Sequence, residues 1–226
     1  MPMNSGRWRR ASRGVVLAAL AAAAAACTIL PAPRATLRNT FLLGPASGPS
    51  GTPPGQCRAG TATLLLTLPR EEPGFDTARM AYLLRPNAVS YYSESRWADT
   101  PARMLAPMIA RALEATGCWR AVVPAPSAIA ADFRLDLGDL VLAQEFFSRP
   151  SRVRLALRAV LVDARDERVV AARRFEAVAD APSDDAPGGA AAAGRAAAEV
   201  SGSLAAWAGA SLPAAGAGQG APGGGR

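Results

Sequence analysis

Three consecutive segments with alternating apolar and polar residues constrain the fold of this chain more than any other feature. They span residues 131–147, 152–163 and 168–178. In the second segment Val153, Leu155 and Leu157 alternate with arginines, the period-two signature of a strand with one buried face. Residues 164–167 (ARDE) then suit a tight hairpin connection. This part of the chain therefore predicts three long strands, the last two joined by a hairpin.

Shorter strands are expected before these segments. Residues 39–43, 61–68, 80–84, 89–92 and 119–123 are rich in aliphatic, aromatic or β-branched residues, and turn residues such as Gly44, Pro69 and Pro124 bound them. The stretch 44–60 is dense in Gly, Pro and Ser, which indicates a loop.

A first helix is predicted from a cap at Asp99 or Thr100, with Pro101 in its first turn, to a stop at Gly117. Its apolar stripe recurs at spacings of three and four and comprises Leu105, Met108, Ile109, Ala112 and Leu113. Pro107 breaks this pattern, because an interior proline removes a hydrogen bond. Either the first turn is bent or the regular helix begins later.

A second helix is predicted over residues 187–208, with Val200, Leu204 and Trp207 as its docking face. It is rich in alanine, but Gly188, Gly189, Gly194 and Gly202 each weaken it by up to ~1 kcal/mol relative to alanine.

These elements predict an α+β fold. We expect an antiparallel sheet of about six strands with two helices packed on one face, forming a single domain over residues 38–209. The absence of βαβαβ alternation argues against a doubly wound fold. Residues 210–226 contain mostly Gly, Ala and Pro with nothing to pack, and we expect them to be disordered.

The N-terminal residues 1–26 have the pattern of a secretory signal. Four arginines, the last of them Arg13, precede an apolar run of 13 residues (14 to 26), which is shorter than the ~20 residues of a membrane-spanning helix. Ala24-Ala25-Ala26-Cys27 then resembles a bacterial lipobox, although alanine replaces the usual large aliphatic residue. The alternative is an ordinary signal peptide cleaved near an A-x-A site, with Cys27 incidental.

Lipidation of Cys27 would anchor the mature protein to a membrane, because two or three acyl chains together give a stable tether. Residues 27–37 would then form the lipidated N-terminus and a proline-containing spacer. An aspartate after the cysteine is the usual signal for retention in the inner membrane. Thr28 stands there instead, which favours the periplasmic face of the outer membrane in a Gram-negative bacterium.

The net charge of +7 does not indicate a nucleic-acid partner. Four of the 25 basic residues lie in the leader, so the mature chain carries 21 basic residues (25 minus 4) against 18 acidic ones, or +3. The basic residues are all arginine, and they do not cluster with aromatic residues as in nucleic-acid-binding proteins.

Cys57 and Cys118 remain if Cys27 is acylated. In an oxidising compartment they could pair and close a loop of about 60 residues. The alternative is two unrelated thiols, because Cys57 lies in the Gly/Pro-rich stretch and Cys118 follows a helix end. The sequence leaves both interpretations open.

The chain offers little material for catalysis. It has no histidine and no lysine, which excludes Ser-His and Cys-His pairs, histidine zinc sites and a P-loop. Asp184 and Asp185 are neighbours, and Asp163, Asp166 and Glu167 cluster, but a solvated helix start and a charged hairpin account for them. We expect no catalytic residue, no metal site and no cofactor. A carboxylate-based hydrolase would need two close, desolvated carboxylates in one pocket.

The segment 91–105, YYSESRWADTPARML, followed by Arg111–Gly117 and Val122, resembles the ABC-type transport auxiliary lipoproteins, the PqiC-like family. Further similar segments occur in the family's order, at 41–43, 132–135, 156–163, 181–184 and 204–207. The resemblance covers about residues 38–209. The loop at 44–60 and the glycines of the last helix depart from the family pattern.

The resemblance implies a non-enzymatic lipoprotein subunit of an ABC/MCE system that moves lipids or other hydrophobic molecules between the inner and outer membranes. Its partners would be an MCE-domain protein, a permease and an ATPase, and some family members are thought to form homo-oligomeric rings. The alternative is a stand-alone structural or assembly lipoprotein of the outer membrane.

Four residues are candidates for a partner interface: Tyr91, Tyr92, Arg96 and Trp97. Arginine, tryptophan and tyrosine concentrate in interface hot spots. The structural alternative is that Trp97 packs over the first turn of the helix and Arg96 pairs with a carboxylate.

Overall fold

The computed structural model describes residues 39–44 and 60–212. The expected leader, Cys27 and its spacer, Cys57 and the tail from residue 213 lie outside the described residues. Within them, eight strands form one sheet. Their bounds are β1 Asn39–Phe41, β2 Thr63–Leu66, β3 Arg79–Leu83, β4 Val89–Trp97, β5 Ala121–Pro124, β6 Phe133–Glu145, β7 Arg152–Asp163 and β8 Arg168–Asp180.

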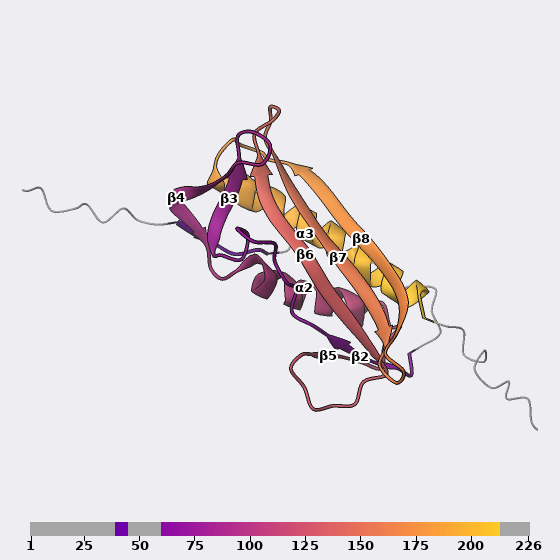
Figure 1. Ribbon diagram of the computed structural model, residues 1–226. Coiled ribbons are helices and arrows are strands. Elements are labelled where there is room, and N and C mark those ends of the chain that lie inside the picture. The colour runs from indigo at the N-terminus through magenta and orange to yellow at the C-terminus, as the bar shows by residue number, and fades with distance from the viewer. Residues whose placement is uncertain (1–38, 45–59, 213–226) are drawn as a thin grey trace, which may run out of the picture. The chain divides into compact units, whose positions relative to one another are not determined.

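The three long strands β6, β7 and β8 pair in antiparallel order, as predicted, and β8 forms an edge of the sheet (Figure 1). Leu135 pairs with Leu161, and Leu157 pairs with Phe175, so the apolar residues of all three strands share one face. The hairpin at 164–167 is confirmed. The period-two pattern locates these strands well because each has one face on the core and one face outward.

The α+β class is confirmed, but the sheet is mixed and not purely antiparallel as predicted. β1 pairs with β4 in parallel, and β6 pairs in parallel with β2 and with β3. One edge of β6 is occupied by β7 along its length, while β2 and β3 share its other edge. Alternation identifies strand residues but carries no information on which strands pair, so the sequence could not reveal the parallel contacts.

Strand β4 is longer than the predicted 89–92 and continues to Trp97. The reason is tertiary, because its second half pairs with β1, with Thr40 opposite Arg96 and Phe41 opposite Trp97.

Two helices cover one face of the sheet, as predicted: α2, Pro101–Ala115, and α3, Ala186–Ala210 (Figure 1). Helix α2 begins at Pro101 and contains Pro107, so the alternative of a later start is wrong. Gly117 adopts a positive φ of 68° after its end, a conformation that glycine adopts without strain.

The N-terminus of α2 is stabilised from outside the helix. Thr100 is the N-cap, but its side chain makes no capping hydrogen bond. The backbone N–H of Ala102 instead donates to Glu71 Oε1 at 2.9 Å. Glu71 also forms an isolated bridge with Leu140 of β6, so one residue connects the sheet to α2.

Helix α3 packs through small residues. Six of its alanines are almost fully buried: Ala192, Ala193, Ala196, Ala197, Ala205 and Ala208. The predicted docking face is confirmed, since Val200 and Leu204 are buried and the Trp207 ring lies 5.5 Å from that of Phe175. Short side chains let this helix approach the sheet closely, which explains the alanine and glycine content.

Candidate interaction surface

The β3–β4 pair contains an irregular stretch. Arg79 lies opposite Arg96, and Ala81 lies opposite Tyr91. Between these pairs β3 advances by two residues (79 to 81) while β4 advances by five (91 to 96). Such a bulge re-aims side chains, so a simple alternation of faces does not hold along this part of β4.

Tyr91 belongs to a small apolar cluster separate from the main core. The cluster comprises Ala81, Leu83 and Ala143, with Phe75 and Tyr91 packed against it. The Tyr91 hydroxyl donates to the carbonyl oxygen of Gly74 at 2.7 Å. The Arg79 guanidinium carbon lies 4.0 Å from the centre of the Tyr91 ring, a cation–π contact.

Tyr92 packs instead against the main core. Its hydroxyl donates to Gln144 Oε1 at 2.9 Å, and Gln144 Nε2 donates to Ser151 Oγ at 2.9 Å. Burial of the ring, together with the nearby charge of Asp185, raises the pKa of Tyr92 to about 12. Tyr92 is therefore a neutral hydrogen-bond donor over the physiological range of pH.

Trp97 is 3% exposed and forms part of the main core together with Ala102, Met104 and Leu105 of α2. Arg96 is exposed, and its Nε donates to the Trp97 carbonyl oxygen at 3.3 Å. No carboxylate of the described residues forms an ion pair with Arg96. The four residues predicted as a partner surface thus have different environments and do not form a single exposed patch in this domain.

A hollow of about 450 Å³ lies beside the bulge. Its lining residues are Thr77, Ala78, Arg79, Tyr92, Ser93, Ser95 and Arg96. Sequence reasoning singled out Arg96 and Tyr92 but missed Arg79. No sequence signal could have found Arg79, because its position opposite Arg96 depends on the bulge.

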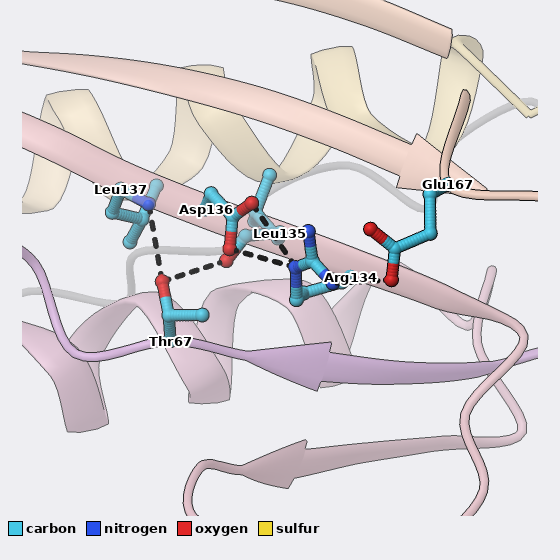
Figure 2. A network of polar contacts seen from close by, with 6 residues as sticks. All are labelled: Thr67, Arg134, Leu135, Asp136, Leu137 and Glu167. Atoms are coloured by element: carbon cyan, nitrogen blue, oxygen red, sulfur yellow. Dashed lines mark hydrogen bonds and ion pairs between the residues drawn. The ribbon is translucent and has the colours of Figure 1, made fainter. Parts of the chain in front are cut away.

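The segment after β2 continues along β6 beyond the end of the strand. Figure 2 shows that Thr67 Oγ1 donates to the Leu135 carbonyl oxygen at 3.1 Å and accepts from the Leu137 N–H at 3.2 Å. The backbone N–H of Arg70 then donates to the Leu137 carbonyl oxygen at 3.1 Å. These bonds place Arg70 beside Gly138.

A second hollow, of about 540 Å³, lies over this part of β6 and is lined by residues that include Arg70, Asp136, Asp139 and Arg158. Arg134 Nε lies 3.1 Å from both carboxylate oxygens of Asp136 (Figure 2). Positive and negative side chains are mixed in this hollow, so their charges offset one another.

The aspartates noted in the sequence have structural hydrogen bonds. Asp185 is the N-cap of α3 and accepts from the Gly188 N–H at 2.8 Å. Asp184 accepts from the Ser151 N–H at 2.7 Å, which lowers the pKa of Asp184. Asp163 and Asp166 accept from backbone N–H groups within the hairpin. A solvated helix start and a charged hairpin describe them well.

Cys118 is 1% exposed, and a Cβ on Gly209 of α3 would lie 2.6 Å from its sulfur. The N–H of Gly60 donates to the Gly117 carbonyl oxygen at 3.1 Å, so Gly60 lies against the backbone of Cys118. Cys57 itself lies outside the described residues, and the pairing stays a prediction.

The mixed sheet with two helices has counterparts among known proteins. The family model described as "ABC-type transport auxiliary lipoprotein component" matches residues 42–205. The chain belongs to this family. ABC-type transport auxiliary lipoproteins are membrane-anchored bacterial proteins named for an association with transport and not for an enzymatic activity. Of the helices among residues 60–212, neither is both long and apolar enough to cross a membrane.

Two solved structures share the fold. The crystal structure of protein XCC0632 from Xanthomonas campestris has a TM-score of 0.65 at 23% identity and covers 76% of this chain and 94% of its own. The crystal structure of an uncharacterised protein has a TM-score of 0.53 at 12% identity, with 74% and 96% covered. The comparison with curated proteins gives no significant match. The auxiliary lipoprotein domain of this chain therefore has counterparts of known structure.

Proposed function

We propose that this protein is a non-enzymatic, lipid-anchored subunit of an ABC/MCE-type system that moves lipids or other hydrophobic molecules between the inner and outer membranes. The observation that carries this proposal is the family match, which covers residues 42–205 and thus nearly all of the described domain. The chain supplies no energy in this scheme, because the ATPase subunit does so.

The proposed anchor is Cys27, acylated after removal of residues 1–26. The proposed location is the periplasmic face of the outer membrane, since Thr28 stands where an inner-membrane protein usually has aspartate. A Cys27→Ala variant should be exported but recovered in the soluble fraction. Finding it still in the membrane pellet would contradict the anchor.

The proposed partners are an MCE-domain protein, a permease and an ATPase, and the lipoprotein is proposed to form a homo-oligomeric ring. Tagged, acylated protein should be purified from its native membranes in several mild detergents and analysed by mass spectrometry and by light scattering. Recovery of an MCE-domain protein with a multimeric lipoprotein is the expected result.

The Cys27→Ala variant, purified from the soluble fraction in the same detergents, serves as the control, because it retains every described residue and lacks only the acylated side chain. If the well-folded, acylated protein is recovered alone in all detergents, the transporter role fails. A stand-alone structural or assembly lipoprotein then becomes the better assignment.

A further inference from the structure

Two arginines face each other across the β3–β4 pair. Arg79 and Arg96 are register partners, and like charges directly opposite each other destabilise a sheet. Among the described residues, neither guanidinium forms an ion pair with a carboxylate. An arrangement that places two uncompensated cations together is favourable when an anion binds between them.

Both arginines are held in position by their neighbours. The Arg79 guanidinium lies over the Tyr91 ring, and that ring is fixed by its own hydrogen bond to Gly74. Arg96 is held through its Nε to the Trp97 carbonyl oxygen. This contact leaves the terminal amino groups of Arg96 available as donors, and a group held in place before binding loses less entropy on binding.

The hollow beside the two arginines has a donor-rich lining. Thr77, Ser93 and Ser95 contribute hydroxyl groups, and its lining residues, all within the described chain, include no aspartate or glutamate. This distinguishes it from the larger hollow on β6, where Asp136 and Asp139 accompany the arginines. Planar guanidinium groups with hydroxyl donors match the oxygens of a phosphate group.

The position of this hollow in the chain points to its ligand. Thr40 of β1 pairs with Arg96, and β1 begins at Asn39, twelve residues after Cys27 (39 minus 27). A fully extended chain of that length spans at most ~40 Å. A lipid anchor at Cys27 would therefore keep the start of β1 within ~40 Å of the membrane surface, and such a tether raises the effective concentration of headgroups at the hollow.

We propose that the hollow between Arg79 and Arg96 binds the phosphate group of a phospholipid headgroup in the leaflet that carries the anchor. The inference rests on the proposed lipidation of Cys27. Such binding orients the domain on the membrane with the β1–β4–β3 side toward the headgroups.

The test uses the mature chain with Cys27→Ala, so that the acyl anchor does not mask headgroup binding. Flotation measures partitioning onto vesicles of phosphatidylethanolamine and phosphatidylglycerol, and onto phosphate-free vesicles of digalactosyldiacylglycerol. The double variant R79A/R96A should bind the phospholipid vesicles roughly tenfold less, because each arginine near an anionic surface contributes to attraction.

The matched control is R158A/R174A. Arg158 and Arg174 are also register partners on the same sheet, so the control removes the same charge from a different place. We expect this pair to change partitioning by less than about twofold. Thermal melting establishes that both double variants are folded. If R79A/R96A is unstable, Arg96→Gln, which preserves the contact between Arg79 and Tyr91, should still reduce binding about threefold.

Four results would overturn the proposal. The first two are an equal loss of vesicle binding in both double variants and unchanged vesicle binding by R79A/R96A. The third is equal binding of the parent protein to phospholipid and phosphate-free vesicles. The fourth is competition by submillimolar inorganic phosphate, which would indicate a site for free phosphate. Loss of a co-purifying protein from R79A/R96A with normal vesicle binding would assign the surface to a protein partner. Because flotation requires neither acylation nor transporter subunits, its outcome is independent of the test of the proposed function.

Discussion

Gly189 of α3 lies directly against the side chain of Gln144 in β6. A Cβ atom on Gly189 would come within 2.2 Å of Gln144 Oε1. Gln144 is 3% exposed and is bonded to both Tyr92 and Ser151. The absence of a side chain at Gly189 therefore leaves room for Gln144 and its buried hydrogen bonds. By helix propensity alone, the same glycine weakens α3.

We predict that Gly189→Ala destabilises the protein by about 1–3 kcal/mol, because the methyl group forces Gln144 to break buried hydrogen bonds. Urea unfolding at neutral pH measures this change. In a Gln144→Ala background the same substitution should be neutral or slightly stabilising, as helix propensity then dominates. An equal loss in both backgrounds would show that the close contact with Gln144 is not the cause.

Glu71→Ala should destabilise the protein by about 1 kcal/mol, because it removes the acceptor for the Ala102 N–H at the start of α2. Burial raises the pKa of Glu71, but the Ala102 hydrogen bond acts in the opposite direction and favours the charged form. Glu71→Gln retains a side-chain oxygen as acceptor and should lose less stability than Glu71→Ala. Glu72→Ala changes the neighbouring carboxylate and is the control, expected within about 0.5 kcal/mol of the wild type. Similar losses for the alanine variants at 71 and 72 would contradict the capping role.

Asp132 should make stability depend on acidic pH. Its carboxylate accepts from the Thr63 N–H at 2.8 Å and from Arg165 at 2.7 Å, and these bonds lower the pKa of Asp132 below its ordinary value of 3.8. A lowered pKa stabilises the fold above the unfolded-state pKa, and this contribution is lost as pH falls through the lower, folded-state pKa.

The wild type should therefore exceed Asp132→Asn in stability at pH 6, and the difference should shrink below about pH 4. Thermal melting of both proteins across this range measures it, and the comparison cancels the titration of the other carboxylates. A difference that stays constant down to pH 2 would exclude linkage through Asp132.

The pairing of Cys57 with Cys118 is the last prediction. Mass spectrometry of the mature chain after alkylation should find these two thiols unmodified until a reductant is added. Cys57→Ser should then lower the stability by roughly 3 kcal/mol, since the closed loop is long. Cys57 is the better position to change, because a hydroxyl at buried Cys118 introduces its own penalty. Alkylation of both cysteines without reductant would establish two separate thiols.

The sequence alone determined the three long strands and both helices. The bounds of β7 agree with the predicted 152–163, and α2 starts at Pro101 after the predicted cap. These predictions succeeded because a residue's side of a strand or helix is set locally, by periods of 2 and 3.6 residues. The motifs that indicate the family could be recognised for a similar reason, because each is a short, local stretch of sequence.

Tertiary structure decided how those elements combine. The parallel contacts of β6 with β2 and β3, the extension of β4 to Trp97 and the capping of α2 by Glu71 all join residues far apart in the chain. The candidate site is of this kind, because Arg79 meets Arg96 only through a bulge in the β3–β4 register. Local periodicity specifies which face of an element is buried. The partner of each element is selected by packing and hydrogen bonding over the whole domain, which no short stretch of sequence contains.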